Sequence, residues 1–157
     1  MISNSIIIPC FNEEGNIDEL VKKCQKFLKF KDNELILVNN GSSDKTREKI
    51  DKHKKKYKNI ISLNIVKNIG FGNGVLRGIE ISKGETIIYT HADPEVDQYD
   101  VITGINLIKK NKEYFIKGNR INRKQNNWSI FDRIISSSLS IITSLIFFKY
   151  IFDLHAQ

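Results

Sequence analysis

The sequence predicts an α/β fold with a mostly parallel sheet flanked by helices. Short apolar runs that suit buried strands alternate along the chain with segments whose apolar residues recur every three and four positions, as on one face of a helix. Strands that alternate with helices are joined by right-handed crossovers into a parallel sheet. At 157 residues, of which 40% are apolar, the chain can form one domain with a hydrophobic core.

A change in the spacing of the apolar residues marks where the first strand gives way to the first helix. The run "SIIIP" predicts a strand that ends at Pro9, because proline cannot donate to a sheet ladder. Asn16 then predicts a helix N-cap, with Glu19 three residues later completing a capping box. The apolar residues of one helix face are Ile17, Leu20, Val21, Cys24, Phe27 and Leu28.

The remaining elements repeat this plan. A buried strand is predicted over 35–38, followed by an Asn-Gly-Ser turn and a helix capped near Ser43 or Asp44. The segments "ISLNIV", "GNGVLRGIEISKG" and "TIIYT" predict a third strand, a third helix ending at Gly84, and a fourth strand.

Charge and cysteine content limit the environment of the protein. The formal net charge of +7 suits an anionic partner, which leaves nucleic acid, an anionic membrane surface and a phosphorylated substrate open. Much of the excess lies in 45–58, where basic and acidic residues alternate as on a solvated helix face. Cys10 and Cys24 have no metal-like spacing and no secretory signal is evident, so a reducing cytoplasm is expected, with both thiols free and buried.

Polar loops follow three of the predicted strands. They read "PCFNEEGN", "NNGSSDKT" and "THADPEVD", and all three are rich in oxygen ligands and hydrogen-bonding groups. Ligands of open parallel sheets bind at the carboxyl ends of the strands, so these loops predict the site. His91, Asp93 and Glu95 of the third loop are of metal-ligand type, and a polar turn that closes the strand is the alternative.

Four motifs in order resemble the nucleotide-sugar-binding region of family-2 inverting glycosyltransferases. They are "IIIPCFNEEGNI", "ELILVNNGSSDKT", "KNIGFGNGVLRGIEISKGETIIYTHADPE" and "KGNR", and the resemblance covers about residues 4–120. The family includes dolichyl- and polyprenyl-phosphate sugar synthases and bacterial polysaccharide enzymes. The resemblance implies a Rossmann-like GT-A fold and a D-x-D motif that binds the donor's ribose and a divalent metal.

The resemblance assigns donor contacts to the first two loops. It implies that Pro9, Phe11 and Glu13 form the first loop, with the aromatic ring near the base and the acid on the nucleoside. Val38 and Asn40 match the end of the second strand, where the family usually has paired aspartates and one accepts a hydrogen bond from the base. The amide of Asn40 can still accept from a uracil or guanine N–H, but it can also donate. A simple Asn-Gly-Ser turn is the alternative.

The sequence "HAD" stands where the family has D-x-D. Asp93 matches the metal-binding aspartate, Glu95 a position that approaches the metal, and His91 replaces the first aspartate. Imidazole with carboxylates suits Mn²⁺ better than Mg²⁺. The ion would neutralise charge that develops on the nucleoside diphosphate leaving group. A turn residue that contacts ribose or solvent is the alternative for His91.

Further residues are implied on the acceptor side. Arg120 and Arg133 match arginines near the phosphates in polyprenyl-phosphate-using relatives, although Arg133 also suits a charged helix surface. Asp153 is the candidate catalytic base for a hydroxyl acceptor, whereas a phosphate acceptor needs no base. The glycine-rich segment 68–74 does not match a dinucleotide fingerprint or a P-loop and is expected to lead into the third helix.

The last part of the sequence is apolar. Residues 134–152 carry a single charge, Lys149, but five serines, so an amphipathic helix at a membrane interface fits better than a spanning helix. A helix that packs on a missing part of the protein is the competing interpretation. We therefore divide the chain into a nucleotide-sugar-binding domain, 1–127, and a segment 128–157 that begins a truncated acceptor or membrane-associating region.

The expected function is transfer of a sugar, with inversion, from a UDP- or GDP-linked donor to a polyprenyl phosphate or a growing glycan. The enzyme is expected in the cytoplasm, as a peripheral protein at the membrane face. An inactive or truncated sugar-nucleotide-binding module is the alternative. A nucleic-acid partner is not expected, because no docking motif occurs. The sequence does not indicate the oligomeric state, the sugar or the base.

Overall fold

The structure, a computed structural model, describes residues 1–92 and 98–110 together with 116, 118, 134, 138, 141, 142 and 145. The chain divides into two compact units, Met1–Glu113 and Tyr114–Gln157. The division predicted from the sequence, between 127 and 128, stays a prediction.

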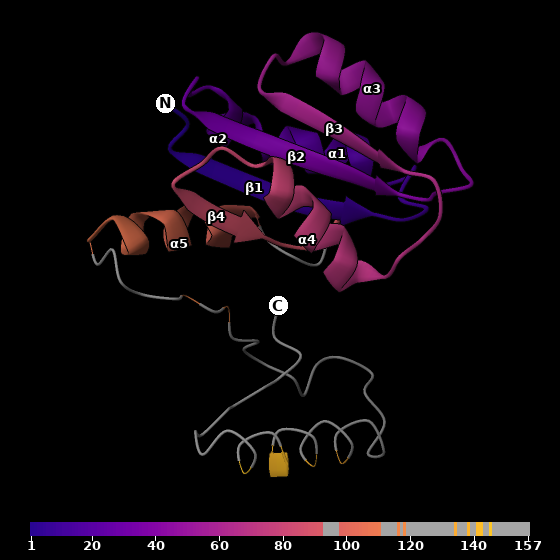
Figure 1. The fold of residues 1–157 in the computed structure, drawn as a ribbon. Helices are drawn as coiled ribbons and strands as arrows, with labels where there is room; N and C mark the ends of the chain where they lie inside the picture. The colour runs from indigo at the N-terminus through magenta and orange to yellow at the C-terminus, as the bar shows by residue number, and fades with distance from the viewer. Residues whose placement is uncertain are drawn as a thin grey trace. The chain divides into compact units, whose positions relative to one another are not determined.

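The first unit is an α/β structure, as predicted (Figure 1). Its elements, in order, are β1 (Asn4–Cys10), α1 (Ile17–Lys23), α2 (Gln25–Leu28), β2 (Asn33–Asn40), α3 (Thr46–Lys56), β3 (Ile60–Ile65), α4 (Phe71–Ile81), β4 (Thr86–Tyr89) and α5 (Gln98–Lys110). The four strands form one sheet in the order β3-β2-β1-β4, and all the strand pairs are parallel.

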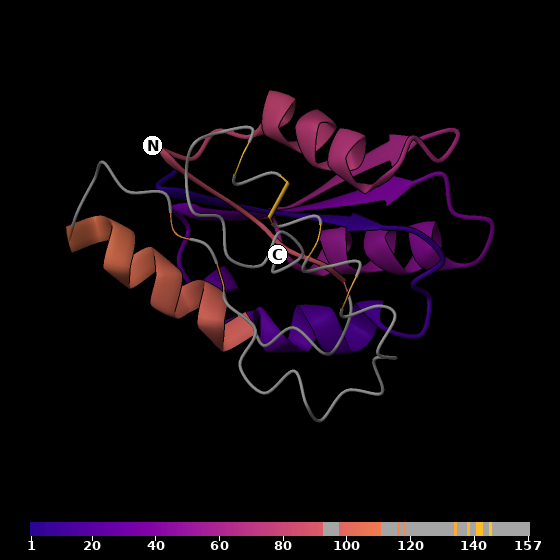
Figure 2. The ribbon, with the colours of Figure 1, turned by 90° about the horizontal axis from the view of Figure 1, so that it is seen from below.

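Helices cover both faces of the sheet (Figure 2). The helices α1, α2, α3 and α5 pack on one face, and α4 packs on the other. The chain steps outward from β1 to β3 and then returns through α4 to place β4 on the other side of β1. The direction of winding therefore reverses between β1 and β4, and this switch point is where open parallel sheets bind ligands.

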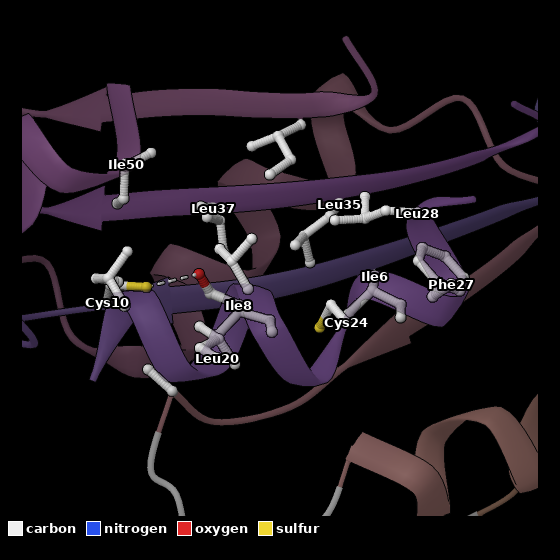
Figure 3. Close-up of a cluster of buried hydrophobic side chains, with 14 of the residues drawn as sticks. Ile6, Ile8, Cys10, Leu20, Cys24, Phe27, Leu28, Leu35, Leu37 and Ile50 are labelled. Atoms are coloured by element: carbon white, nitrogen blue, oxygen red, sulfur yellow. Dashed lines mark hydrogen bonds between the residues drawn. The ribbon is translucent and has the colours of Figure 1, made fainter. Parts of the chain in front are cut away.

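The apolar strand residues alternate between the two faces. In β1, Ile6 and Ile8 face the larger core, which the predicted apolar face of the first helical segment completes (Figure 3). Ile7 faces α4 with Ile36 and Val38 of β2. Burial on both faces explains why these strands read as continuous apolar runs.

Pro9 does not end the first strand, contrary to the sequence prediction. The strand continues to Cys10, and Pro9 pairs in register with Val38. Residues two apart in a strand face the same neighbour, and the carbonyl of Ile7 accepts from Thr90 on the β4 side. The missing N–H of Pro9 would point to that side, where the ladder with β4 ends two residues earlier, at the pair Ile7–Tyr89.

The first helical segment departs from the predicted capping box. Asn16 is the N-cap, but its side chain makes no capping hydrogen bond. Its Nδ2 instead donates to Oε2 of Glu13 at 2.6 Å. The helix is also interrupted at Cys24, which separates α1 from α2, although the predicted apolar face is buried throughout.

The other predicted helix ends are off by one to three residues. Lys45 occupies the N-cap position of α3, one residue after Asp44, but the side chain that accepts from the first helical N–H is that of Asp44. The helix α4 ends at Ile81 rather than Gly84. Gly84 has another role, because its N–H donates to Oγ of Ser5 at 2.8 Å and a Cβ there would lie 2.5 Å from the Ser5 nitrogen. Gly84 thus allows the turn before β4 to pass close to the start of β1.

Candidate functional site

The loops predicted to form the site begin at the carboxyl ends of β1, β2 and β4. Phe11 and Asn12 follow β1, Gly41 follows β2, and His91 follows β4. Two of these ends, those of β1 and β4, flank the switch point of the sheet.

Asn12 ties the loop after β1 to the loop after β2. Its Oδ1 accepts from the Ser43 N–H at 2.9 Å, and its own N–H donates to Oγ of Ser42 at 3.1 Å. Asn12 is the one described non-glycine residue with a positive φ, 56°, a conformation that asparagine tolerates better than most residues. The left-handed conformation lets both the backbone and the side chain of Asn12 form hydrogen bonds to the loop after β2.

A second set of bonds extends this link. The Glu13 N–H donates to Oγ1 of Thr46 at 2.8 Å, and the Glu14 N–H donates to Oδ2 of Asp44 at 3.1 Å. In return, the Lys45 N–H donates to Oε2 of Glu14 at 2.9 Å. Reciprocal bonds of this kind hold the two loops as one preorganised platform, which reduces the entropy lost when a ligand binds.

Asp44 also serves the start of α3. Its Oδ1 accepts from the N–H of Thr46 at 3.0 Å, which satisfies a donor that the helix leaves unpaired. Partial burial raises the pKa of Asp44, but the hydrogen bonds from Thr46 and Glu14 outweigh it and hold the pKa below its ordinary value. The platform therefore keeps a carboxylate ionised close to the site.

The platform presents an aromatic ring and an acid. Phe11 is 46% exposed, a large exposure for phenylalanine beside a buried strand end. Glu13 is half-buried and receives the bond from Asn16. Pro9 and Val38 lie in the strands beneath them, paired in register. The predicted contacts of these four residues with the donor stay predictions.

The amides of Asn39 and Asn40 are engaged by the protein itself. Asn39 accepts from the Ser42 N–H at 3.3 Å and donates to Oδ1 of Asn64 at 3.3 Å. Asn40, only 2% exposed, accepts from the Ile69 N–H at 3.3 Å and donates to the carbonyl of Gly70 at 3.1 Å. The predicted contact of Asn40 with a base stays a prediction, and its described partners belong to the loop before α4.

That loop runs very close to the turn after β2. Gly41 has φ 73°, and a Cβ there would lie 2.3 Å from the backbone nitrogen of Asn68. Only glycine fits this position, because both the conformation and the contact exclude a side chain. The predicted structural role of segment 68–74 agrees with this geometry, since the loop leads directly into α4.

His91 stacks on Phe71, the first residue of α4. The ring centroids are 4.2 Å apart and the ring planes are inclined by 15°. The imidazole is half-buried at the end of β4. Asp93 and Glu95, its predicted partners on a metal, lie outside the described residues, and so do Arg120, Arg133 and Asp153.

The residues that the structure describes contain no group of three His, Cys, Asp or Glu side chains that could hold a metal ion. Within the same residues, no helix has the length and apolar character needed to cross a membrane. Cys10 and Cys24 are free and buried, as predicted. Burial raises the pKa of the Cys24 thiol to about 12 and raises that of Cys10 strongly, so neither thiol is a nucleophile at neutral pH.

Sequence reasoning did not assign a role to Asn12, Ser42 or Thr46 of the platform, and it assigned Asp44 only as a candidate cap of the next helix. Their residue types do carry a signal, because Asn, Ser and Asp bind nearby backbone groups in turns. Their partners lie about 30 residues away in the chain, and only the parallel pairing of β1 with β2 brings them together.

Comparison with known proteins identifies the family. The sequence model of Glycosyl transferase family 2 matches residues 5–155, nearly the whole chain. The chain belongs to Glycosyl transferase family 2. The resemblance noted in the sequence is thereby confirmed.

One curated relative and two solved structures illustrate what this chain is similar to. The dolichyl-phosphate beta-glucosyltransferase ALG5A of Trichomonas vaginalis is 30% identical over 107 residues, which cover 62% of this chain and 33% of that protein. Staphylococcus aureus TarS 1-349 in complex with UDP-GlcNAc has a TM-score of 0.62 at 21% identity, over 83% of this chain and 38% of TarS. The mannosyltransferase PcManGT of Pyrobaculum calidifontis, in complex with GDP-Man and Mn²⁺, has a TM-score of 0.57 at 17% identity, over 73% and 33%.

The family-2 chain spans about a third of the length of the curated relatives that it matches first. The structural similarity at this identity establishes the GT-A fold. The four-stranded parallel sheet with helices on both faces is the part of that fold that contains the predicted donor-side loops.

Proposed function

We propose that this chain forms the donor-binding part of an inverting glycosyltransferase. The enzyme transfers a sugar from a UDP- or GDP-linked donor to a polyprenyl phosphate or a growing glycan. The observation that carries the proposal is the hydrogen-bonded platform beside the switch point, in a chain that belongs to Glycosyl transferase family 2.

The similar proteins support each half of the reaction. TarS was solved with UDP-GlcNAc and PcManGT with GDP-Man. These complexes support a nucleotide-sugar donor whose base is either uracil or guanine. The Trichomonas relative is a dolichyl-phosphate glucosyltransferase, which supports a polyprenyl phosphate acceptor. On this proposal Phe11 and Glu13 contact the nucleoside, and Arg120 and Arg133 contact acceptor phosphates. Asp153 serves as base only for a hydroxyl acceptor.

A divalent ion fits the donor set of this sequence. His91 supplies an imidazole at the end of β4, and Asp93 and Glu95 follow it with carboxylates. This mixed set suits Mn²⁺ better than Mg²⁺. When bound, the ion would supply positive charge to the nucleoside diphosphate leaving group.

Calorimetric titration with UDP and with GDP, each with and without Mn²⁺, tests the donor site. We expect binding of one nucleotide that depends on Mn²⁺, and Asp93→Ala should abolish that dependence. Asp100→Ala, which removes an exposed carboxylate at the start of α5, is the matched control and should bind as the wild type does. If neither nucleotide binds to the wild-type chain, the proposed function is wrong.

We also propose that the apolar tail holds the enzyme at the cytoplasmic face of a membrane. Ile134, Ser138, Ile141, Ile142 and Leu145 are helical and exposed, and their spacing places them on one helix face. Oγ of Ser138 donates to the carbonyl of Ile134 at 2.7 Å, which lowers the cost of moving this serine into lipid. An exposed apolar helix face of this kind suits a membrane interface.

Sedimentation with anionic lipid vesicles tests the role of the tail. We expect the wild-type chain to sediment with the vesicles and Ile141→Asn to reduce the bound fraction, because an amide replaces apolar surface on the lipid-facing side. Ile116→Asn, at a partly exposed isoleucine outside this helix face, is the matched control. Equal binding of Ile141→Asn and wild type would rule out this attachment.

A further inference from the structure

The contact between Phe71 and His91 constrains the imidazole. The two rings are stacked with centroids 4.2 Å apart and planes within 15° of parallel. The lone pair and the N–H of an imidazole lie in the ring plane, so any group that binds a ring nitrogen must approach in that plane. Fixing the plane of His91 therefore fixes the directions in which its nitrogens can bind.

The position of Phe71 is set by the loop before it. Gly70, the N-cap of α4, has φ 83°, and its carbonyl accepts the first helical bond from the Gly74 N–H at 3.0 Å. The same carbonyl accepts from Nδ2 of Asn40 at 3.1 Å, and Oδ1 of Asn40 accepts from the Ile69 N–H at 3.3 Å. A buried side chain at the end of β2 thus anchors the start of α4.

These contacts form one connected series from the sheet to the predicted metal motif. Asn40 is buried at the carboxyl end of β2, the loop it holds leads into Phe71 at the start of α4, and Phe71 stacks on His91. The amide of Asn40 serves both bonds, because its Nδ2 donates to the Gly70 carbonyl and its Oδ1 accepts from the Ile69 N–H, whereas an ionised carboxylate could only accept.

We propose that Phe71 and Asn40 are positioning residues that orient His91 to bind the divalent ion of the donor site. This inference deepens the proposed function and rests on it. Phe71 acts by stacking on the imidazole ring, and Asn40 acts by fixing the loop that precedes Phe71. Groups that orient a metal-binding histidine without touching the metal commonly change metal affinity by about tenfold or more.

Paramagnetic broadening by Mn²⁺ alone, without nucleotide, tests the proposal. The sequence has three histidines, so protein labelled only in histidine gives few imidazole signals, and His91→Gln assigns the signal of His91. His53 is an internal reference, because it lies on α3 and its Nε2 is 2.8 Å from Oδ1 of Asp18. In the wild type we expect Mn²⁺ to broaden the His91 signal at concentrations that leave His53 sharp.

The variants separate positioning from packing. Phe71→Leu keeps an apolar side chain but removes the ring, and we expect it to require about tenfold more Mn²⁺ for the same broadening of His91. Phe71→Tyr keeps the ring and should restore the wild-type response. Phe30→Leu, the same change at an exposed phenylalanine before β2, is the matched control and should have no effect.

Asn40→Asp tests the other end of the series. It replaces the donating amide with a carboxylate that faces the Gly70 carbonyl and Oδ1 of Asn68, and we expect the same weakened response as in Phe71→Leu. If this variant does not fold, Phe71→Leu carries the test alone.

Two results would overturn the proposal. One is equal broadening of His91 in the wild type and in Phe71→Leu, and the other is a His91 signal that Mn²⁺ leaves sharp in the wild type. Either result leaves the proposed function standing if UDP or GDP still binds in the calorimetric titration. Absence of nucleotide binding there is the separate failure of the proposed function.

Discussion

Asn39 and Asn40 are neighbours in β2, yet their amides serve two different loops. Successive strand residues point to opposite faces of the sheet. Asn39 therefore bonds to Ser42 in the turn after β2, and Asn40 bonds to the loop before α4. Two residues of the same type hold the two loops that border the candidate site.

Asp18 offers a residue-scale test of how the first helical segment is held. Its carboxylate joins α1 to α3, with Oδ2 at 2.7 Å from Nζ of Lys49 and Oδ1 at 2.8 Å from Nε2 of His53. The hydrogen bonds from Lys49 and then His53 lower the pKa of Asp18 below its ordinary value of 3.8. The carboxylate thus stabilises the fold fully above pH 3.8, and this stabilisation is lost as the pH falls through the lowered pKa.

We predict that Asp18→Asn lowers the free energy of unfolding at neutral pH by about 0.5 kcal/mol, a small value because the pair is exposed and screened. The difference from wild type should shrink as the pH falls below 3.8. Urea unfolding at a series of pH values measures it. Glu85→Gln, which removes another exposed carboxylate, is the matched control for the loss of one surface charge. A difference for Asp18→Asn that stays constant with pH would contradict the assignment.

At the scale of elements, α4 packs unusually close to the sheet. Gly74 and Gly78 face the strands, and a Cβ on Gly78 would lie 2.3 Å from Cγ2 of Ile7 and 3.3 Å from Cγ2 of Val38. Gly72 lies on the exposed side of the same helix with no atom within 4 Å of its Cβ position. The packing therefore excludes a side chain at Gly78 but leaves room for one at Gly72.

We predict that Gly78→Ala destabilises the protein by about 1–3 kcal/mol, because an overpacked core must shift. Gly72→Ala should instead be neutral or stabilising by up to about 1 kcal/mol, because alanine favours the helix. Urea unfolding of both variants measures the contrast. Equal stability of Gly78→Ala and Gly72→Ala would contradict the close packing of α4 against the sheet at Gly78.

The sequence predicts the order and type of these elements well, since the apolar periods of strands and helices are local. It fails where the outcome depends on which partner a single residue meets in the folded protein. Pro9 stays within a strand through its pairing with β2, beyond the end of the β4 ladder, and the amide of Asn16 is bonded to Glu13 rather than used as a cap. The site followed the same rule, because the sequence located the loops but not the bonds between Asn12 and Ser43 or between Asn40 and Gly70.

At the scale of the first unit, polar groups have different roles at the amino ends and at the carboxyl ends of the strands. At the amino ends, the buried Oε1 of Glu34 accepts from Oγ of Ser5 at 2.7 Å and from the Lys83 N–H at 2.6 Å, so polar groups are used to close the fold. At the carboxyl ends, Phe11 is exposed above a hydrogen-bonded platform. A ligand is therefore expected at one edge only.

The central claim is that a nucleoside diphosphate binds at the carboxyl edge of this sheet. The most direct test is to titrate the labelled chain with UDP or GDP and to map the shifts of backbone amide signals by NMR. Mg²⁺ in excess replaces Mn²⁺ in this titration, because Mn²⁺ is paramagnetic and broadens the signals. We predict that Phe11, Asn12 and His91 shift while Asn33 and Lys83 at the opposite edge do not. Shifts confined to the amino edge, or no shifts with either nucleotide, would contradict the claim.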